Sequence, residues 1–470
     1  MQKLLDSLSE EIQDYYNHVD TIPLIPSIDI SEIHEHLNNQ YNFQKPLALE
    51  EINSDVQKMM RRWTLHNSHP HYMGLFVPAA LLPSIIADTY TALYNPQLGA
   101  WSHAPGANEI ERHVLKHLMK KFGLNPEIGW ANFTTGGTEA NLSAVLAALT
   151  KSFPEYGEKG LQALKGMPVF YVSEEAHHSF NKIGQITGLG NQAVRNIRTD
   201  KEFSLDLDEL KRQYIEDTNN GYLPFMVAAT AGTTSGGVID PLLELAEFCR
   251  KNNLWFHVDA AYGGAAVMSE KTKHLLNGIE NADSITCDAH KWFSVSMSAG
   301  MFFCRDKKAV LDTFHSGAAY LPESGKNTFD AFSTTLQCSR RFIGLKLFMT
   351  LANMGDAGYA GMIEKQIELG HYLRKQLIQA GFTIVNKTEL PVICFTHKNI
   401  ANGTVKISEI LDSIYARKNF WISQTKLGKK TRVLRACTTS FRTEVRDIDE
   451  FVNEISQSLK NPTEVKAALK

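Results

Sequence analysis

The sequence has few cysteines and no long apolar run. Its six cysteines among 470 residues are scattered, and no two form a C-x-x-C pair, which argues against a disulfide scaffold or a cysteine zinc site. No apolar run reaches the ~18 residues of a spanning helix, and residues 1–16 are charged and polar, unlike a signal peptide. We therefore expect a cytoplasmic protein without a membrane partner.

The sequence also lacks a charge of one sign. The formal net charge is −3, and charged residues make up 21% of the chain. This balance gives no basic surface for nucleic acid. With 43% hydrophobic residues over 470 positions, the composition is that of a globular protein with more than one domain, and its size favours an enzyme.

The pattern along the chain predicts three parts. Residues 1–85 show helical spacing of apolar residues and form an N-terminal helical arm, which packs on its own domain or clasps a partner subunit. Residues 86–360 form a large domain, in which strands alternate with helices from about residue 130, typical of a mostly parallel sheet. Residues 361–470, with a helix at 363–381 and strands that include 392–396, form a small α+β domain. The fold class is α/β.

A glycine turn joins the first predicted strand to a helix. Residues 132–141 run through Gly136 and Gly137 to Thr138 and an Ala/Leu-rich helix. Glycine lets a ligand approach the backbone, and a helix N-terminus favours an anion. The turn binds a phosphate, or it is a plain strand-to-helix turn with a threonine cap. It matches neither the P-loop nor the G-x-G-x-x-G pattern, so nucleotides are disfavoured.

Further polar residues follow the predicted strands 169–173, 225–230, 255–259 and 283–288. They are His177, Thr234, Asp259 and Lys291. In open α/β sheets, ligands bind at the carboxyl ends of strands. A buried lysine is costly unless paired, but lysine forms Schiff bases with carbonyls. Pyridoxal 5′-phosphate (PLP) is the cofactor that needs this set: a lysine, a carboxylate for its ring nitrogen, a phosphate turn and a stacking imidazole.

A metal site at the three histidines at positions 66, 69 and 71 is an alternative to a PLP site. No carboxylate lies among them, and Pro70 places them in a loop without fixed ligand geometry. We expect no metal, and interpret this stretch as an aromatic pocket wall.

From about residue 60 to 460 the chain resembles the group II PLP-dependent amino-acid decarboxylases, the relatives of aromatic-L-amino-acid, glutamate and diaminobutyrate decarboxylases. The matching motifs are residues 135–141, 176–177, 232–234, 257–262, 288–291 and 336–342. The resemblance implies a fold-type I PLP enzyme, a carboxy-lyase that releases CO2 from an L-amino acid.

The resemblance also implies roles for single residues. Lys291 binds the cofactor aldehyde, Asp259 pairs with the ring nitrogen, and His177 stacks on the ring. The remaining cofactor contacts it implies are Gly136, Gly137, Thr138 and His290 at the phosphate, Thr234 at the 3′-oxygen, and Ala261 on the opposite face of the ring. Asp240 matches an acidic position that supports the site.

A homodimer with shared active sites is implied in the same way. The expected substrate pocket consists of His71, Tyr72, Phe76, Leu98 and Trp101, partly donated across the dimer. These aromatics favour an aromatic amino acid slightly, since no arginine stands out for a distal carboxylate.

The family's loop tyrosine, which protonates Cα, is missing. Its position falls near residues 329–332, where the sequence has no tyrosine, and Tyr320 is the only tyrosine in the loop at 316–336. We expect plain decarboxylation with Tyr320 or His177 as the proton donor. The alternatives are oxidative deamination to an aldehyde, transamination, decarboxylation of a small acidic or diamino acid, and an inactive regulatory relative.

Overall fold

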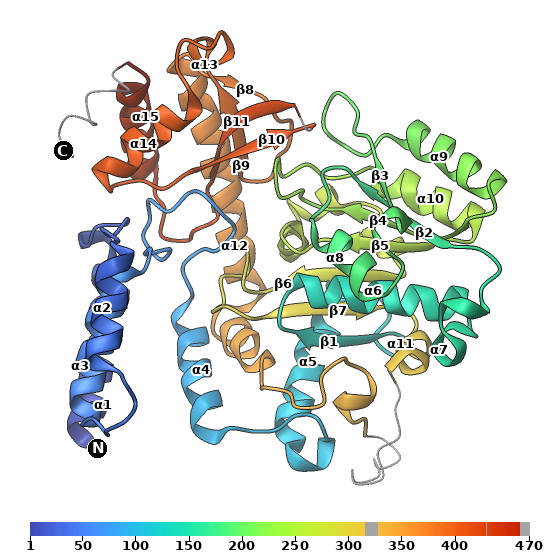
Figure 1. Ribbon diagram of the computed structural model, residues 1–470, viewed down its shortest axis with the longest axis horizontal. Helices are drawn as coiled ribbons and strands as arrows, with labels where there is room; N and C mark the ends of the chain where they lie inside the picture. The colour runs from blue at the N-terminus through green and yellow to red at the C-terminus, as the bar shows by residue number, and fades with distance from the viewer. Residues whose placement is uncertain (315–327, 429, 461–470) are drawn as a thin grey trace.

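A computed structural model describes residues 1–314, 328–428 and 430–460. Its centre is a seven-stranded sheet of order β1-β7-β6-β5-β4-β2-β3 (Figure 1). The strands of this sheet are β1 (Trp130–Thr134), β2 (Pro168–Ser173), β3 (Val194–Ile197), β4 (Leu223–Thr230), β5 (Trp255–Asp259), β6 (Ser284–Asp288) and β7 (Gly300–Cys304).

Only β7 runs against its neighbours. It pairs antiparallel with β1 and β6, whereas β6, β5, β4, β2 and β3 pair in parallel. Because two antiparallel pairings restore the direction, β1 points the same way as β6. The carboxyl ends of six strands therefore meet at one edge of the sheet, which confirms the predicted mostly parallel α/β fold.

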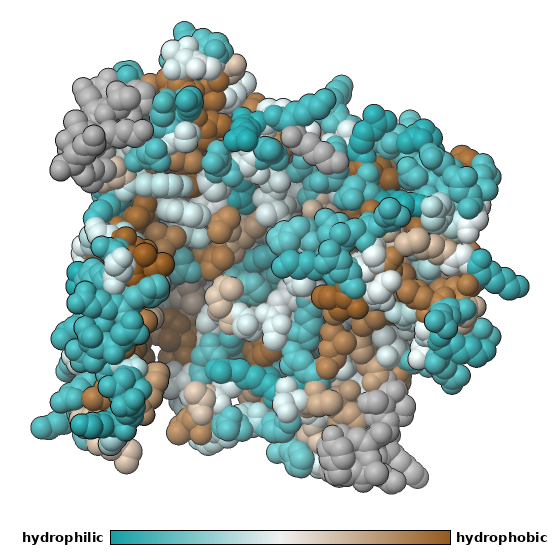
Figure 2. Space-filling model, in the orientation of Figure 1, coloured by the Kyte–Doolittle hydropathy of each residue, from teal (hydrophilic) through white to brown (hydrophobic). Residues whose placement is uncertain are grey.

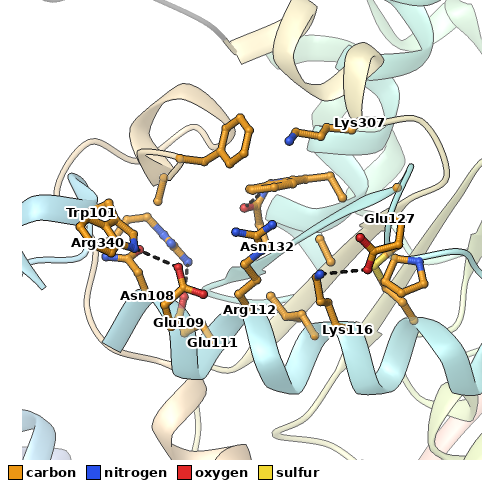
Figure 3. A pocket seen from close by; sticks show the side chains of 18 residues that line it. Trp101, Asn108, Glu109, Glu111, Arg112, Lys116, Glu127, Asn132, Lys307 and Arg340 are labelled. Atoms are coloured by element: carbon orange, nitrogen blue, oxygen red, sulfur yellow. Dashed lines mark hydrogen bonds and ion pairs between the residues drawn. The ribbon is translucent and has the colours of Figure 1, made fainter. Parts of the chain in front are cut away.

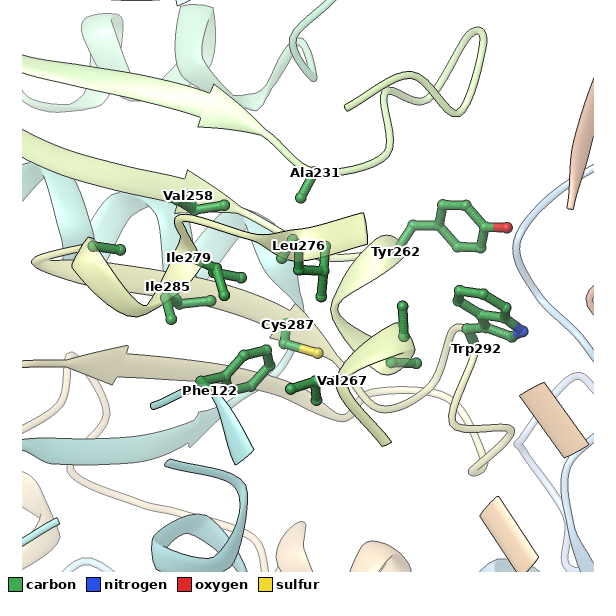
Figure 4. Close-up of a cluster of buried hydrophobic side chains, with 14 of the residues drawn as sticks. Phe122, Ala231, Val258, Tyr262, Val267, Leu276, Ile279, Ile285, Cys287 and Trp292 are labelled. Atoms are coloured by element: carbon green, nitrogen blue, oxygen red, sulfur yellow. The ribbon is translucent and has the colours of Figure 1, made fainter. Parts of the chain in front are cut away.

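Helices cover both faces of this sheet, since its strands are apolar on both sides. One face packs on α6 (Gly137–Ser152), α8 (Ser179–Ile186) and α11 (Lys307–Phe314). The other face packs on α5 (Pro105–Lys121), α9 (Leu207–Asn219), α10 (Leu242–Asn252) and α12 (Gly344–Gln379). Figure 4 shows part of this layer, with Val258 and Ile285 along the strands and with Tyr262 and Trp292 stacked together beyond the strand ends. These bulky side chains fix the strand ends that carry the site.

A second sheet lies in the C-terminal part of the chain. Its strands pair antiparallel in the order β10-β11-β9-β8. They are β8 (Thr383–Ile384), β9 (Val392–Thr396), β10 (Ser423–Leu427) and β11 (Thr431–Cys437), and they pack with α13 (Lys398–Ala401), α14 (Ile407–Arg417) and α15 (Val445–Lys460). α12 joins both parts and bends at Gly355, where φ is 64°.

The N-terminal arm consists of α1 (Gln2–His18), α2 (Ile30–Gln40) and α3 (Leu49–Trp63), and it stands beside the body in Figure 1. None of the three helices contains a buried residue. α4 (Leu82–Tyr94) follows and packs on α12, and the short α7 (Tyr156–Lys159) follows α6. The division of the chain at residues 85 and 360 stays a prediction, and α12 runs through the second of these positions.

Several elements have the bounds that the sequence predicts, among them the strands at 255–259 and 392–396. The sequence analysis missed β3 and β10, and it began the helix at 363 instead of 344. β10 alternates between half-buried and exposed residues, so its apolar signal is weak. In the part of the chain that the structure describes, no helix is long and apolar enough to cross a membrane.

Candidate active site

The strand ends surround a cavity of about 410 Å³. A volume of this size lies within the range of small-molecule sites. The residues that line it are Phe76, Thr135, Gly136, Gly137, Thr138, Glu139, Asn141, His177, Thr230, Gly232, Thr234, Asp259, Ala261, Tyr262, Asp288, His290, Lys291 and Ser298. The structure thus brings together all nine residues predicted to bind the cofactor.

Asp259 is a buried carboxylate at the end of β5. Its Oδ2 accepts a hydrogen bond from Asn141 Nδ2 at 2.8 Å, and its Oδ1 accepts one from the Ala261 backbone N–H at 3.1 Å. Both donors stabilise the ionised form, which burial alone would penalise. Asn141 lies in the quoted 135–141 motif, but the sequence analysis gave it no role.

Lys291 has a carboxylate partner from its own strand end. Its Nζ lies 3.1 Å from Asp288 Oδ2, and the Lys291 side chain is 23% exposed, so the carboxylate compensates the charge of a partly buried ammonium. His290 Nε2 lies 3.7 Å from the same oxygen, and burial lowers the pKa of His290. Asp288 is a site residue that sequence analysis missed, although its position three residues before Lys291 was visible.

His177 lies in the turn after β2. The Ser179 backbone N–H donates to its Nδ1 at 3.3 Å, so Nε2 carries the proton of the neutral ring. Burial lowers the pKa of His177. At neutral pH, His177 therefore lines the cavity as a neutral imidazole with a donor N–H.

The glycine turn forms a cradle at the N-terminus of α6. A Cβ on Gly137 would lie 3.0 Å from Asp288 Oδ2 and 3.4 Å from Ala261 Cβ, whereas one on Gly136 would meet only His290 Cε1, at 3.7 Å. Only a glycine fits comfortably at position 137. Gly136 leaves an open space in front of a helix N-terminus, where backbone N–H groups favour an anion.

This donor set fits PLP. The cavity offers an amine on Lys291, a carboxylate on Asp259, a neutral imidazole on His177 and a glycine cradle at a helix N-terminus. In addition, Asp288 Oδ1 is buried and has no hydrogen-bond partner among the described residues. An unsatisfied buried oxygen of this kind indicates a site built around a further polar group.

Thr234 and Asp240 lie in the turn after β4. Thr234 is exposed and lines the cavity. Asp240 is buried, and its carboxylate accepts hydrogen bonds from the backbone N–H groups of Thr230 and Leu205. Burial raises its pKa to about 7. Asp240 thus fixes this turn from behind and does not line the cavity.

Of the five residues predicted for the substrate pocket, Phe76 alone lines this cavity. Its ring stacks on Tyr262 at 3.9 Å between centroids. Tyr72 stacks instead on Trp421, at 5.0 Å, and His71 stacks on Phe420, at 4.0 Å. Both of these residues connect the loop before α4 to the C-terminal part of the chain.

Leu98 and Trp101 lie elsewhere in the same chain. Leu98 packs in a small buried cluster with Ala104 and Phe342. Trp101 lines a separate cavity beside α5, where its indole N–H donates to Glu109 Oε1 at 2.9 Å (Figure 3). A contribution of these residues to the site of a partner subunit stays a prediction.

The predicted proton donor Tyr320 lies outside the described residues. Phe329, in the range 329–332 where the family's tyrosine was expected, packs against Trp130 at 5.3 Å between centroids. The Lys307 ammonium lies 3.3 Å from the centre of the Phe329 ring. Among the described residues, no group of three or more His, Cys, Asp or Glu side chains could hold a metal ion.

Comparison with known proteins identifies relatives over most of the chain. Tryptophan decarboxylase 2 of Oryza sativa subsp. japonica is 27% identical over 453 residues, 93% of this chain and 90% of the relative. The acidic amino acid decarboxylase GADL1 of Xenopus tropicalis is 31% identical over 417 residues, 85% of this chain and 81% of the relative. The chain is thus similar to decarboxylases of two kinds.

Solved structures share the fold. The structure of mouse CSAD has a TM-score of 0.88 at 24% identity and covers 97% of this chain and 98% of its own. Catharanthus roseus tryptophan decarboxylase in complex with L-tryptophan has a TM-score of 0.86 at 22% identity and covers 98% of both chains.

The family model described as "Pyridoxal-dependent decarboxylase conserved domain" matches residues 32–398. This match covers most of the chain and confirms the resemblance stated on the sequence motifs. The chain belongs to the pyridoxal-dependent decarboxylase family, and it is an enzyme whose cofactor is PLP.

Proposed function

We propose that this enzyme decarboxylates an L-amino acid to its amine and CO2, with Lys291, Asp259 and His177 acting on the cofactor and the substrate. The observation that carries this proposal is the single cavity into which an amine, a buried carboxylate and a neutral imidazole converge from three strand ends. Decarboxylases among the relatives support the reaction.

PLP, when bound, supplies an aldehyde for amino groups and a conjugated ring that accepts the electron pair of the broken Cα–carboxylate bond. Lys291 Nζ would hold the aldehyde carbon, and Asp259 would hold a proton on the ring nitrogen. The other residues that would hold the cofactor are Gly136, Gly137, Thr138 and His290 at the phosphate, with Thr234 and Ala261 at the ring. These assignments are supported by the fact that all of these residues line one cavity.

His177 acts on the substrate side of the ring. Its Nε2–H would donate to the substrate carboxylate and orient it, and the imidazole would cover the cofactor and exclude water. The neutral state that burial gives it suits a hydrogen-bond donor. To return a proton to Cα, the ring would first take up a second proton and act as an imidazolium. Tyr320 remains the second proposed donor.

For the substrate we propose an aromatic amino acid. Phe76 and Tyr262 stack at the wall of the cavity, and an aromatic side chain can extend this stack. Tryptophan and tyrosine decarboxylases among the relatives support this choice.

A second candidate is an acidic amino acid, favoured by Arg435. This guanidinium is buried, at 2% exposure, and lies 4.6 Å from the centre of the Phe76 ring. Its Nε and Nη2 have no hydrogen-bond partner among the described residues, although buried N–H groups of an arginine are normally satisfied. A rotation of Phe76 would bring a distal carboxylate to these donors. The sequence analysis had found no such arginine.

We also propose a cytoplasmic homodimer with the arm clasping the partner. Exposed apolar residues gather on the arm and on α4, and Figure 2 shows hydrophobic residues along the hollow between arm and body. The exposed apolar residues of the arm and α4 include Leu5, Leu8, Val56, Met60, Ile86, Tyr90 and Leu93. Apolar patches of this kind mark protein interfaces.

Sedimentation velocity of the full chain tests the dimer, and a single 52.6 kDa species would contradict it.

The reaction is tested with a panel of aromatic, acidic and diamino L-amino acids. We expect CO2 and the amine in equal amounts, fastest with an aromatic substrate. Mass spectrometry identifies the product, and ammonia and peroxide are measured in parallel. Peroxide formed in step with CO2 and an aldehyde would show the oxidative reaction instead, and a keto acid without CO2 would show transamination.

Lys291 is tested by the visible absorbance of the purified enzyme. A Schiff base between a lysine and PLP absorbs near 420 nm, a property of the cofactor. Lys291→Ala should abolish this band and lower the decarboxylation rate at least ~1,000-fold, because the amine that holds the aldehyde is lost. The matched control is Lys271→Ala, at an exposed lysine paired with Glu364. This variant should keep both the absorbance band and the decarboxylation rate. Retention of the band in Lys291→Ala refutes the assignment.

Arg435→Met separates the two substrate classes. If an acidic substrate reaches the guanidinium, kcat/KM for acidic amino acids falls at least ~10-fold more than for aromatic ones, since a charge-assisted contact is lost. If the substrate is aromatic, both fall together. Arg432→Met, at an exposed arginine of the same strand, is the matched control and should change neither.

A further inference from the structure

Asp259 is the last member of a buried chain of hydrogen bonds that begins at Trp255. The indole N–H of Trp255 donates to Ser284 Oγ at 2.8 Å. Ser284 Oγ lies 2.8 Å from His257 Nδ1, and His257 Nε2 lies 3.1 Å from Asn141 Oδ1. Asn141 Nδ2 then donates to Asp259 Oδ2 at 2.8 Å. We call this chain the buried relay.

The relay is assembled from three elements by simple strand geometry. Trp255, His257 and Asp259 alternate along β5, so their side chains lie on the same face of the sheet. Ser284 is the registered neighbour of His257 on β6, and Asn141 comes down from the first turns of α6. All five residues are buried, with Trp255 the most exposed at 7%.

The two ends of the relay fix the direction of the hydrogen bonds next to them. A carboxylate accepts only, so Asn141 must present its NH2 to Asp259 and its Oδ1 to His257. His257 Nε2 must therefore carry a proton. At the other end an indole N–H donates only, so Ser284 accepts from Trp255. Its own O–H donates to His257 Nδ1 when that nitrogen carries no proton.

His257 is neutral in this arrangement. Burial lowers the pKa of His257 to about 4, so the ring carries one proton at neutral pH, and that proton sits on Nε2. Each donor thus points toward Asp259. Hydrogen bonds aligned in one direction polarise one another, and each strengthens the next.

We propose that the buried relay is a positioning device for the cofactor: it holds Asp259 ionised and turned toward the ring nitrogen, so that this nitrogen stays protonated. Its members are Trp255, Ser284, His257 and Asn141. The inference rests on the proposed role of Asp259 and extends it to four residues, three of which do not line the cavity. Asn141 makes the direct contact, and the other three fix the orientation of its amide.

Other charged and titratable groups also face Asp259. His177, Lys291 and Asp288 line the same cavity, and any variant must leave them in place. Ser179 Oγ offers a built-in control, because Asn141 Nδ2 also donates to it, at 3.3 Å, outside the relay.

The test uses full-length enzyme loaded with PLP that is labelled with ¹⁵N at the ring nitrogen. In the wild type we expect the chemical shift of a protonated ring nitrogen. Asn141→Leu should shift it toward the unprotonated value and raise the dissociation constant of PLP about tenfold or more, as expected for a lost hydrogen bond to a charge. Trp255→Phe and Ser284→Ala should move the shift in the same direction by less. Ser179→Ala should leave both readouts at the wild-type values.

Labelling of the histidines gives a second, independent readout. In the wild type, the His257 signals, identified by their loss in His257→Gln, should show the proton on Nε2. A proton on Nδ1, or a charged ring at neutral pH, would overturn the relay. The relay would also be overturned if Asn141→Leu folded and kept the wild-type PLP affinity and ring-nitrogen shift. If Asn141→Leu does not fold, the same result in Trp255→Phe would overturn it. Failure of the proposed role of Asp259 is distinguishable, because the ring nitrogen would then be unprotonated in the wild type itself. Failure of the proposed reaction would appear only in the products of the amino-acid panel, with the ring shifts unchanged.

Discussion

The site depends on the hydrogen bonds that hold the Asp259 carboxylate at the end of a buried strand. A lone buried carboxylate loses its hydration and takes up a proton. Here the Asn141 amide and the Ala261 backbone N–H replace that hydration at 2.8 and 3.1 Å. A parallel sheet makes this possible, since β5 and β6 end side by side and α6 begins above them.

The same sheet edge holds the positive charge of the site. Lys291 follows β6, and its Nζ lies 3.1 Å from Asp288 Oδ2, so the charges of these two residues compensate each other. In the proposed function, Asp259 holds the ring nitrogen of PLP and Lys291 its aldehyde. The glycine turn lies close to Asp288, where only a small residue fits at position 137. The Lys291–Asp288 ion pair, the glycine turn and the residues proposed to bind the cofactor thus lie together at one edge of the sheet.

The wall of the cavity connects the cofactor to the substrate. Phe76 lines the cavity and contacts the Arg435 guanidinium, which does not line it. The two proposed substrate classes differ in which of these two side chains the substrate meets. The relatives include decarboxylases of aromatic and of acidic amino acids.

The sequence by itself determined the alternation of strands and helices, the glycine turn, and the polar residues that end the strands. These are local patterns, and the parallel sheet brings Lys291, Asp259, His177 and Gly136 to one edge by topology alone. Only the tertiary structure decided which side chains touch. Asn141 and Asp259 are 118 positions apart, Arg435 lies behind Phe76, and Trp101 faces a different cavity. Such contacts depend on how helices and sheets pack, which no local pattern encodes.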